Sequence, residues 1–172
     1  LGHIYPNVDE TKCVNFGLCK SACPANNSVE FNKPVITYAA YSLDEEIHRT
    51  STSGGIAATF SKYVVKNGGV VYGCSSLVNN EVRHIRVEDE ENLPLLRGSK
   101  YVQSYIGNTF SQVKDDILNG MPVLFSGTPC QVAGLRAFLG RDYDQLLLVD
   151  MICHGVPSPL VWKQYLTHRV KK

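Results

Sequence analysis

The residues best suited to chemistry are six cysteines spread unevenly along 172 residues: Cys13, Cys19, Cys23, Cys74, Cys130 and Cys153. Three of them crowd into eleven residues near the start, and Cys130 and Cys153 follow apolar runs. Disulfide frameworks are typical of small secreted chains without a sufficient core, whereas clustered thiols in a reducing compartment bind metals or carry redox chemistry. The regular α/β pattern described below needs no disulfides, so we expect a cytoplasmic protein with metal or redox use.

Two polar turns carry the later cysteines. In SGTPCQ, residues 126–131, Pro129 suits the first turn of a helix and places Cys130 near a helix N-terminus, where a thiolate is stabilised. In CHGVPSP, residues 153–159, Cys153 and His154 stand at the end of a second apolar run. If the two runs are neighbouring strands, the two thiols converge. A Cys130–His154 nucleophile and a pair of iron–sulfur ligands both remain open at this point.

A third turn, STSGG at residues 51–55, precedes a helical pattern. Ser53 is a candidate N-cap, and glycines let a ligand approach the backbone. Free N–H groups and the helix dipole favour a phosphate at such a place, although an ordinary capped helix start explains the residues equally well. Cys74, after VVYG, fits a small buried hydrophobic residue.

The N-terminal cysteines lie in CVNFGLCKSACP, residues 13–24, which follows the bacterial ferredoxin run C-x2-C-x2-C-x3-C-P with one exception. Phe16 occupies the second cysteine position and cannot bind iron. In ferredoxins with two clusters, the fourth cysteine of a run binds the other cluster. Cys13 and Cys19 therefore supply two ligands to one cluster and Cys23 one to another, so we expect any iron–sulfur cluster here to be incomplete.

Strand and helix patterns alternate after residue 34, while residues 1–34 show neither. We predict a degenerate ferredoxin-like segment with a linker at 24–34 as one part, and an α/β domain at 35–172 as the other. The expected strands are 35–42, 70–77, 82–88, 122–127 and 146–153, the last two buried, with a turn at Asn79–Asn80. The expected helices are 56–67 (Ile56, Phe60 and Val64 on one face), a short one within 91–100, 108–119 (Phe110, Val113 and Ile117 on one face), 131–139 and 158–170, with a turn region at 43–55. Continuous apolar strands between helices predict a mixed or mainly parallel sheet flanked by helices.

Composition excludes several functions. The formal net charge is +1 and only 19% of residues are charged, which gives no footprint for nucleic acid. The basic residues 168–172 fit a solvated helix end. No apolar run is long enough to span a bilayer. The chain does not begin with Met and opens in the middle of a pattern, so we expect a piece of a longer protein.

The motifs together resemble one family over nearly the whole chain. They are GHIYPNVDETKCVNFGLCKSACP, STSGGIAATFSKYVVKNGGVVYGC, RHIRVE, LRGSKYVQS, VLFSGTPCQVAGLRAFLG and VDMICHGVPSP. This set is similar to the coenzyme F-420 hydrogenase/dehydrogenase beta-subunit family, and its bacterial members in particular. GSKYVQS, GTPCQ and CHGVPSP carry most of the specificity.

The resemblance implies a flavoprotein that passes electrons between iron–sulfur clusters, FAD and a substrate such as a deazaflavin coenzyme. It implies FAD phosphates at Ser53, Gly54 and Gly55, and a flavin site along Lys100, Tyr101, Gln103, Gly127 and Thr128. It also implies that Cys130 and Cys153 bind or flank a cluster near the flavin. Lys100 is the expected electrostatic partner of a pyrophosphate or a reduced flavin.

Two departures from the family pattern leave alternatives. Phe16 removes one cluster ligand. Family chains also usually continue into a second part with more cysteines. We therefore expect missing segments or a redox partner protein to supply the remaining cluster ligands. The main hypothesis is an FAD- and iron–sulfur-dependent oxidoreductase domain. The alternatives are a non-catalytic subunit of a redox complex and a thiol enzyme that uses Cys130 and His154.

Overall fold

A four-stranded mixed sheet forms the centre of the molecule. The computed structural model describes residues 2–26, 33–77 and 80–170, and the strand order is β2-β1-β3-β4. The strands are β1 (Val70–Ser76), β2 (Val82–Val87), β3 (Val123–Gly127) and β4 (Leu146–Asp150). β1 pairs antiparallel with β2 and parallel with β3, and β3 pairs parallel with β4. The predicted α/β class with a mixed, mainly parallel sheet is confirmed.

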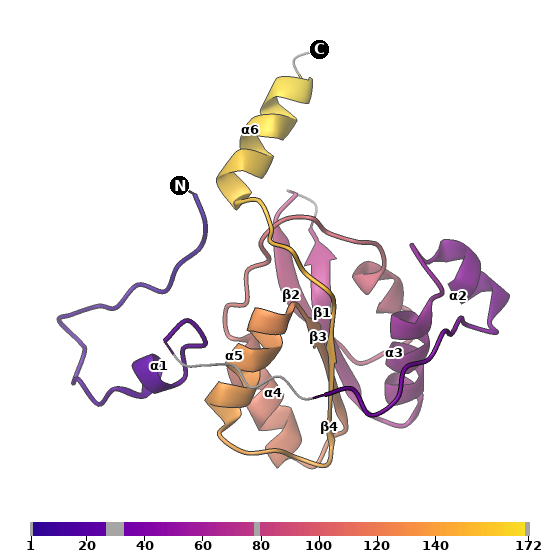
Figure 1. Ribbon diagram of the computed structural model, residues 1–172, viewed down its shortest axis with the longest axis horizontal. Helices are drawn as coiled ribbons and strands as arrows, with labels where there is room; N and C mark the ends of the chain where they lie inside the picture. The colour runs from indigo at the N-terminus through magenta and orange to yellow at the C-terminus, as the bar shows by residue number, and fades with distance from the viewer. Residues whose placement is uncertain (1, 27–32, 78–79, 171–172) are drawn as a thin grey trace.

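Helices cover both faces of this sheet (Figure 1). One face packs against α4 (Thr109–Leu118) and α5 (Pro129–Leu139), and the other against α3 (Ile56–Lys66) and the 3-10 helix η1 (Leu93–Leu96). On α4, Val113 and Ile117 are one turn apart and both are buried, with Phe110 packed beside them, as predicted. On α3, Val64 is buried as predicted, but Phe60 is 43% exposed. The neighbouring residue Ser61 is buried in its place, so the predicted helical face is wrong at Phe60.

A polar cluster closes the α4 side of the sheet. The Tyr72 hydroxyl donates to Asp116 at 2.5 Å, and Arg86 Nε donates to the same carboxylate at 2.8 Å. Burial and the hydrogen bond to Asp116 both raise the pKa of Tyr72. Burial opposes ionisation of Asp116, but the donors on Arg86 and Tyr72 outweigh it and lower the pKa of the carboxyl group.

Two strand predictions need correction. β4 stops at Asp150 instead of continuing through Cys153, and it is only partly buried because it lies at the edge of the sheet. Residues 35–42 form no strand in the described structure, and Val35 is 95% exposed. These residues have no regular secondary structure. The end of the segment contacts Gly54, because the Ser42 N–H donates to the Gly54 carbonyl at 2.6 Å. A β-prone composition therefore does not make a strand where the segment does not pair with the sheet.

The expected turn region 43–55 contains the short helix α2 (Glu45–Thr50). The Asp44 carboxylate accepts hydrogen bonds from the backbone N–H groups of Glu46 and Ile47, both at 3.1 Å, and so caps this helix. Only Ile47 of α2 is buried. A single apolar residue gave too weak a periodic signal for the helix to be predicted from the sequence.

The N- and C-terminal parts extend from the sheet (Figure 1). Residues 2–26 contain one helical turn, α1 (Leu18–Ser21). The predicted last helix is present as α6 (Pro159–Val170), and it projects away from the body. Most of the predicted linker, residues 27–32, lies outside the described residues, as do Asn79 of the predicted turn and Lys171 and Lys172 of the basic end. Across the described part of the chain, no helix is both long and apolar enough to cross a membrane.

Candidate functional site

A cavity of about 840 Å³ lies beyond the carboxyl ends of β1 and β3. Ligands of open α/β sheets gather at this edge. Seven of the eight residues expected at a cofactor line its wall: Ser53, Gly54, Gly55, Lys100, Gln103, Gly127 and Thr128. Tyr101 is the exception, since its side chain is 77% exposed and it is not part of the wall. The structure therefore brings together residues that lie up to 75 positions apart in the sequence.

The start of α3 differs from the sequence expectation. Gly55, with a φ of 80°, is the N-cap, and no side chain caps the helix, so Ser53 is not the cap. The first N–H groups of α3 thus have no capping side chain beside the cavity. Gly54 is required by packing, because a Cβ there would lie 2.7 Å from the Ala40 carbonyl oxygen.

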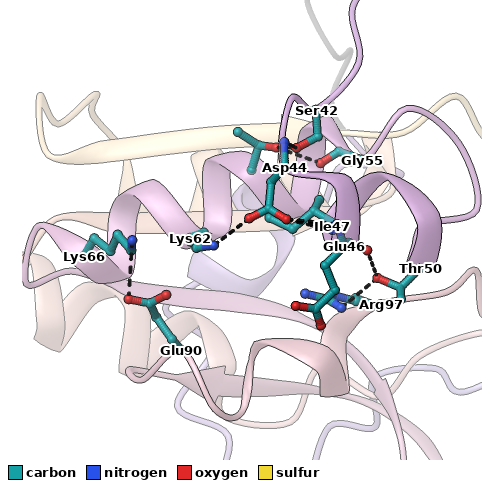
Figure 2. A network of polar contacts seen from close by, with 11 residues as sticks. Ser42, Asp44, Glu46, Ile47, Thr50, Gly55, Lys62, Lys66, Glu90 and Arg97 are labelled. Atoms are coloured by element: carbon teal, nitrogen blue, oxygen red, sulfur yellow. Dashed lines mark hydrogen bonds and ion pairs between the residues drawn. The ribbon is translucent and has the colours of Figure 1, made fainter.

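The outer wall of the cavity is formed by α2, the 51–55 loop and η1. Lys62 of α3 donates to Asp44 at 2.7 Å, and Arg97 donates to the Thr50 hydroxyl at 2.8 Å (Figure 2). The Asp44–Lys62 pair is about one-third exposed on each side. These contacts fasten α2 to the neighbouring elements mainly at the surface.

The turn between β3 and α5 forms a second part of the wall. Pro129 is the first residue of α5, as predicted, and the Thr128 N–H donates to Gln131 Oε1 at 3.0 Å. Cys130 follows, exposed, with its sulfur 3.2 Å from the Thr128 hydroxyl. The partner of Cys130 is thus Thr128, and His154 is an exposed residue of the 153–158 turn outside the cavity wall.

The floor of the cavity contains residues that the sequence did not single out as functional. Cys74 of β1 and His84 of β2 pair directly across the two strands. The His84 ring bonds the Ser104 hydroxyl through Nδ1 at 2.6 Å and the Ser126 carbonyl through Nε2 at 3.0 Å. Burial lowers the pKa of His84 and raises that of Cys74. The register of the β1–β2 hairpin could have predicted this pair. Ser76 and Val82 are the last paired residues before the turn, and Cys74 and His84 each lie two residues further from the turn, so they pair with each other.

Two cations belong to the wall. Burial lowers the pKa of Lys100, whose ammonium donates to the carbonyls of Leu95 and Arg97 at 3.4 Å and 2.7 Å. Arg97 Nε is buried and has no partner in the described structure. A buried donor without an acceptor is costly, and an anionic ligand would supply that acceptor.

A dinucleotide with an aromatic ring fits these properties. The wall combines Arg97 and the start of α3 with the apolar side chains of Val71, Leu93, Leu96, Leu124 and Val149. Pockets for organic cofactors are mostly apolar with a few convergent polar groups, and this volume lies in their usual range. The residues present thus fit an anionic cofactor with a ring system, the class to which the FAD implied by the family resemblance belongs.

The candidate metal ligands do not gather into a site within the described structure, where no three His, Cys, Asp or Glu side chains are placed to hold a metal ion. Cys13, Cys19, Cys130 and Cys153 are exposed, and Cys23 is partly buried. β3 and β4 are parallel neighbours, as the convergence of the two later cysteines requires. Cys130 lines the cavity but Cys153 does not.

Comparisons with known proteins agree with the motifs. Residues 120–172 match the family described as the C terminus of the coenzyme F420 hydrogenase/dehydrogenase beta subunit. The family resemblance expected from the sequence is confirmed over this part of the chain. No curated protein matches.

One solved structure with a similar fold is a chain of the F420-reducing [NiFe] hydrogenase complex from Methanosarcina barkeri, in a xenon-derivatised form. The similarity has a TM-score of 0.59 at 18% sequence identity and covers 77% of this chain. It covers 48% of that chain, so the present chain spans about half the length of its structural neighbour. At this identity the likeness concerns the fold.

Proposed function

We propose that this chain, similar to the coenzyme F420 hydrogenase/dehydrogenase beta-subunit family, is the FAD-binding part of a redox enzyme that passes electrons to or from a small-molecule substrate. The observation that carries the proposal is the cavity at the carboxyl edge of the sheet, because it unites seven residues that the family resemblance places at a flavin. The similarity to a chain of a hydrogenase complex supports a role beside a redox partner protein.

Each part of the wall has a role in this proposal. The uncapped start of α3 and the unpartnered Arg97 Nε would hold the phosphates. The β3–α5 turn, with Gly127 and Thr128, and the Lys100 ammonium would border the ring system. FAD, when bound, exchanges one or two electrons, and the protein supplies position and electrostatics. The apolar side chains of the wall, such as Leu93 and Leu96, would exclude water from the ring.

FAD titration of the purified chain tests the proposal. We expect quenching of flavin fluorescence with saturation, and we expect Arg97→Met to weaken binding about tenfold, since one charge-assisted hydrogen bond to a phosphate is lost. Arg136→Met is the matched control, because Arg136 is an exposed arginine of α5 paired with Asp142 at 3.3 Å. Failure of both the chain and a form extended at either end to bind FAD would refute the assignment.

An iron–sulfur cluster near the flavin is the finer part of the proposal. Cys130 and Cys153 would be its ligands, completed by cysteines of a redox partner protein. Anaerobic reconstitution followed by iron and sulfide assays checks this, with Cys130→Ser and Cys153→Ser expected to lower the iron content. Unchanged iron content in both variants would exclude these two thiols as ligands.

A further inference from the structure

The first described residues of the chain lie at the boundary between the cavity and solvent. His3 is exposed and also lines the cavity, together with Gln103 and Val156. His3 Nε2 lies 3.1 Å from the carbonyl oxygen of Val156, which only accepts, so the imidazole donates from this nitrogen. Residues 2–5 therefore belong to the rim of the cavity, and we call them the N-terminal strap.

One glutamine side chain holds the strap. The Ile4 N–H donates to Gln103 Oε1 at 2.7 Å, and Gln103 Nε2 donates to the Ile4 carbonyl at 2.9 Å. The side-chain amide thus pairs with both backbone polar groups of one residue, as an antiparallel neighbouring strand would. The backbone N–H of Gln103 donates to the Pro157 carbonyl at 3.1 Å. Gln103 therefore fastens the strap and the 153–158 turn to the same point of the rim.

Close packing fixes the start of the strap. Gly2 has a φ of 80°, and a Cβ at this position would lie 2.4 Å from Leu160 Cβ and 2.9 Å from Ser158 Oγ. These two residues stand at the start of α6, beside which the N-terminal end of the chain lies (Figure 1). Glycine is thus required at this position both for its backbone conformation and for the close approach.

The rest of the strap is weakly held. Ile4 and Tyr5 are 39% and 72% exposed, and residues 2–9 have no regular secondary structure. A segment that is attached by a few hydrogen bonds and buries little apolar area opens locally at a lower free-energy cost than the centre of a sheet. The strap can therefore release while the floor of the cavity keeps its packing.

We propose that the strap closes the cavity, that Gln103 is the positioning residue that holds it shut, and that a bound ligand favours the closed state through contact with His3. Ligand entry and exit then require the strap to open. A ligand that contacts the strap only in the closed state shifts the equilibrium toward closure, and by linkage closure strengthens ligand binding by the same factor. The strap leads into the segment with Cys13, Cys19 and Cys23, so occupancy of the cavity also restrains this segment.

The reactivity of Cys74 reports on closure without any ligand. Cys74 lines the cavity and is partly buried, whereas Cys13 and Cys19 are exposed. The probe is a maleimide that carries a bulky group, and mass spectrometry of peptides from the whole labelled chain measures the rate at each thiol. Gly2→Ala should displace the strap and label Cys74 about tenfold faster, while Cys13 and Cys19 keep their rates.

Gly17→Ala is the matched control. Gly17 also has a positive φ, 79°, but a Cβ there would meet no atom within 4 Å. This variant therefore strains the same part of the chain without displacing the strap. The rate at Cys74 should be that of the parent chain, and a rate as high as in Gly2→Ala would show that backbone strain, and not release of the strap, exposes the thiol.

A second variant separates the hydrogen bonds of Gln103 from the stability of the fold. Gln103→Leu removes both hydrogen bonds to Ile4, so the Ile4 amide should exchange about tenfold faster and Cys74 should be labelled faster, as in Gly2→Ala. The amide of Phe125, in the centre of the sheet, should exchange as in the parent chain. Unchanged labelling of Cys74 in either variant, or an equal gain in exchange at Phe125, would overturn the proposal.

Coupling to a ligand rests on the proposed function, and FAD is the probe for it. Saturating FAD should slow exchange of the Ile4 amide in the parent chain, and Gly2→Ala should release FAD about tenfold faster. An unchanged rate of FAD release in Gly2→Ala would overturn the coupling. If neither the parent chain nor its extended forms bind FAD, the proposed function fails, whereas the labelling of Cys74 still decides whether the strap closes the cavity.

Discussion

The floor and the outer wall of the cavity are held by different forces. The floor is built from β1, β2 and β3, where Leu124 and Phe125 are at most 1% exposed and His84 bonds through both ring nitrogens. The outer wall relies on α2 and on contacts such as Asp44–Lys62 that are about one-third exposed. Exposed ion pairs contribute little to stability, whereas buried packing contributes much. The floor is therefore the rigid part of the cavity, and the outer wall is the part able to adapt to a ligand.

The largest effect should come from the floor. Phe125→Ala removes a fully buried ring that packs on His84 and Phe110, and we expect a loss of about 3–5 kcal/mol in the free energy of unfolding. Urea unfolding measures it. The control is Phe138→Ala on α5, where the ring is 39% exposed, and a loss on the order of 1 kcal/mol is expected. Equal losses in the two variants would remove the distinction between floor and surface.

The polar cluster beside the floor should give the next effect. Asp116→Ala leaves Tyr72 without its acceptor and Arg86 with only its more exposed partner Glu88, and we expect a loss of about 2–3 kcal/mol at pH 7. The folded-state pKa of Asp116 is lowered, so its contribution is complete above the unfolded pKa of about 3.9 and disappears as the pH falls through the folded value. The difference between parent and variant should therefore shrink at low pH. A constant difference from pH 7 to pH 2 would contradict this origin.

The smallest effect on stability should come from the outer wall. Lys62→Met removes the ion pair with Asp44 but leaves Asp44 as the cap of α2, so the urea midpoint should move less than in Asp116→Ala. Amide exchange at Ile47 should nevertheless become faster, because α2 loses its attachment to α3. Lys66→Met, whose partner Glu90 is 3.9 Å away, is the control and should leave Ile47 unchanged. Slower exchange at Ile47 in Lys62→Met would show that the ion pair does not hold α2.

Long periodic elements were predictable from the sequence, and context-dependent ones were not. The helical face of Val113 and Ile117 and the strand around Phe125 have local patterns that the core requires. Val35 lies in an equally β-prone run, but in the described structure this run pairs with no strand of the sheet. Pairing is a property of the whole sheet and has no local signature.

The candidate site shows the same limit. Gly127 was expected near the cavity because its turn follows a strand end, whereas Lys100 was expected there only from the family resemblance. Arg97 was missed because the absence of a partner for its Nε appears only in three dimensions. Cys74 looked like a core thiol until the hairpin register placed it opposite His84. Whether the cavity residues bind FAD remains a prediction.

Residues near the N-terminus contact cavity-lining residues that lie far from them in the sequence. His3 bonds the carbonyl of Val156, 153 positions away, and Ile4 exchanges two hydrogen bonds with the Gln103 amide, 99 positions away. The β1–β2 hairpin, by contrast, closes over only a few residues. Contacts between distant residues carry the largest loop-closure cost and form late in folding. A refolding chain should therefore acquire its sheet first and its capacity to bind a ligand afterwards, in a separate kinetic phase.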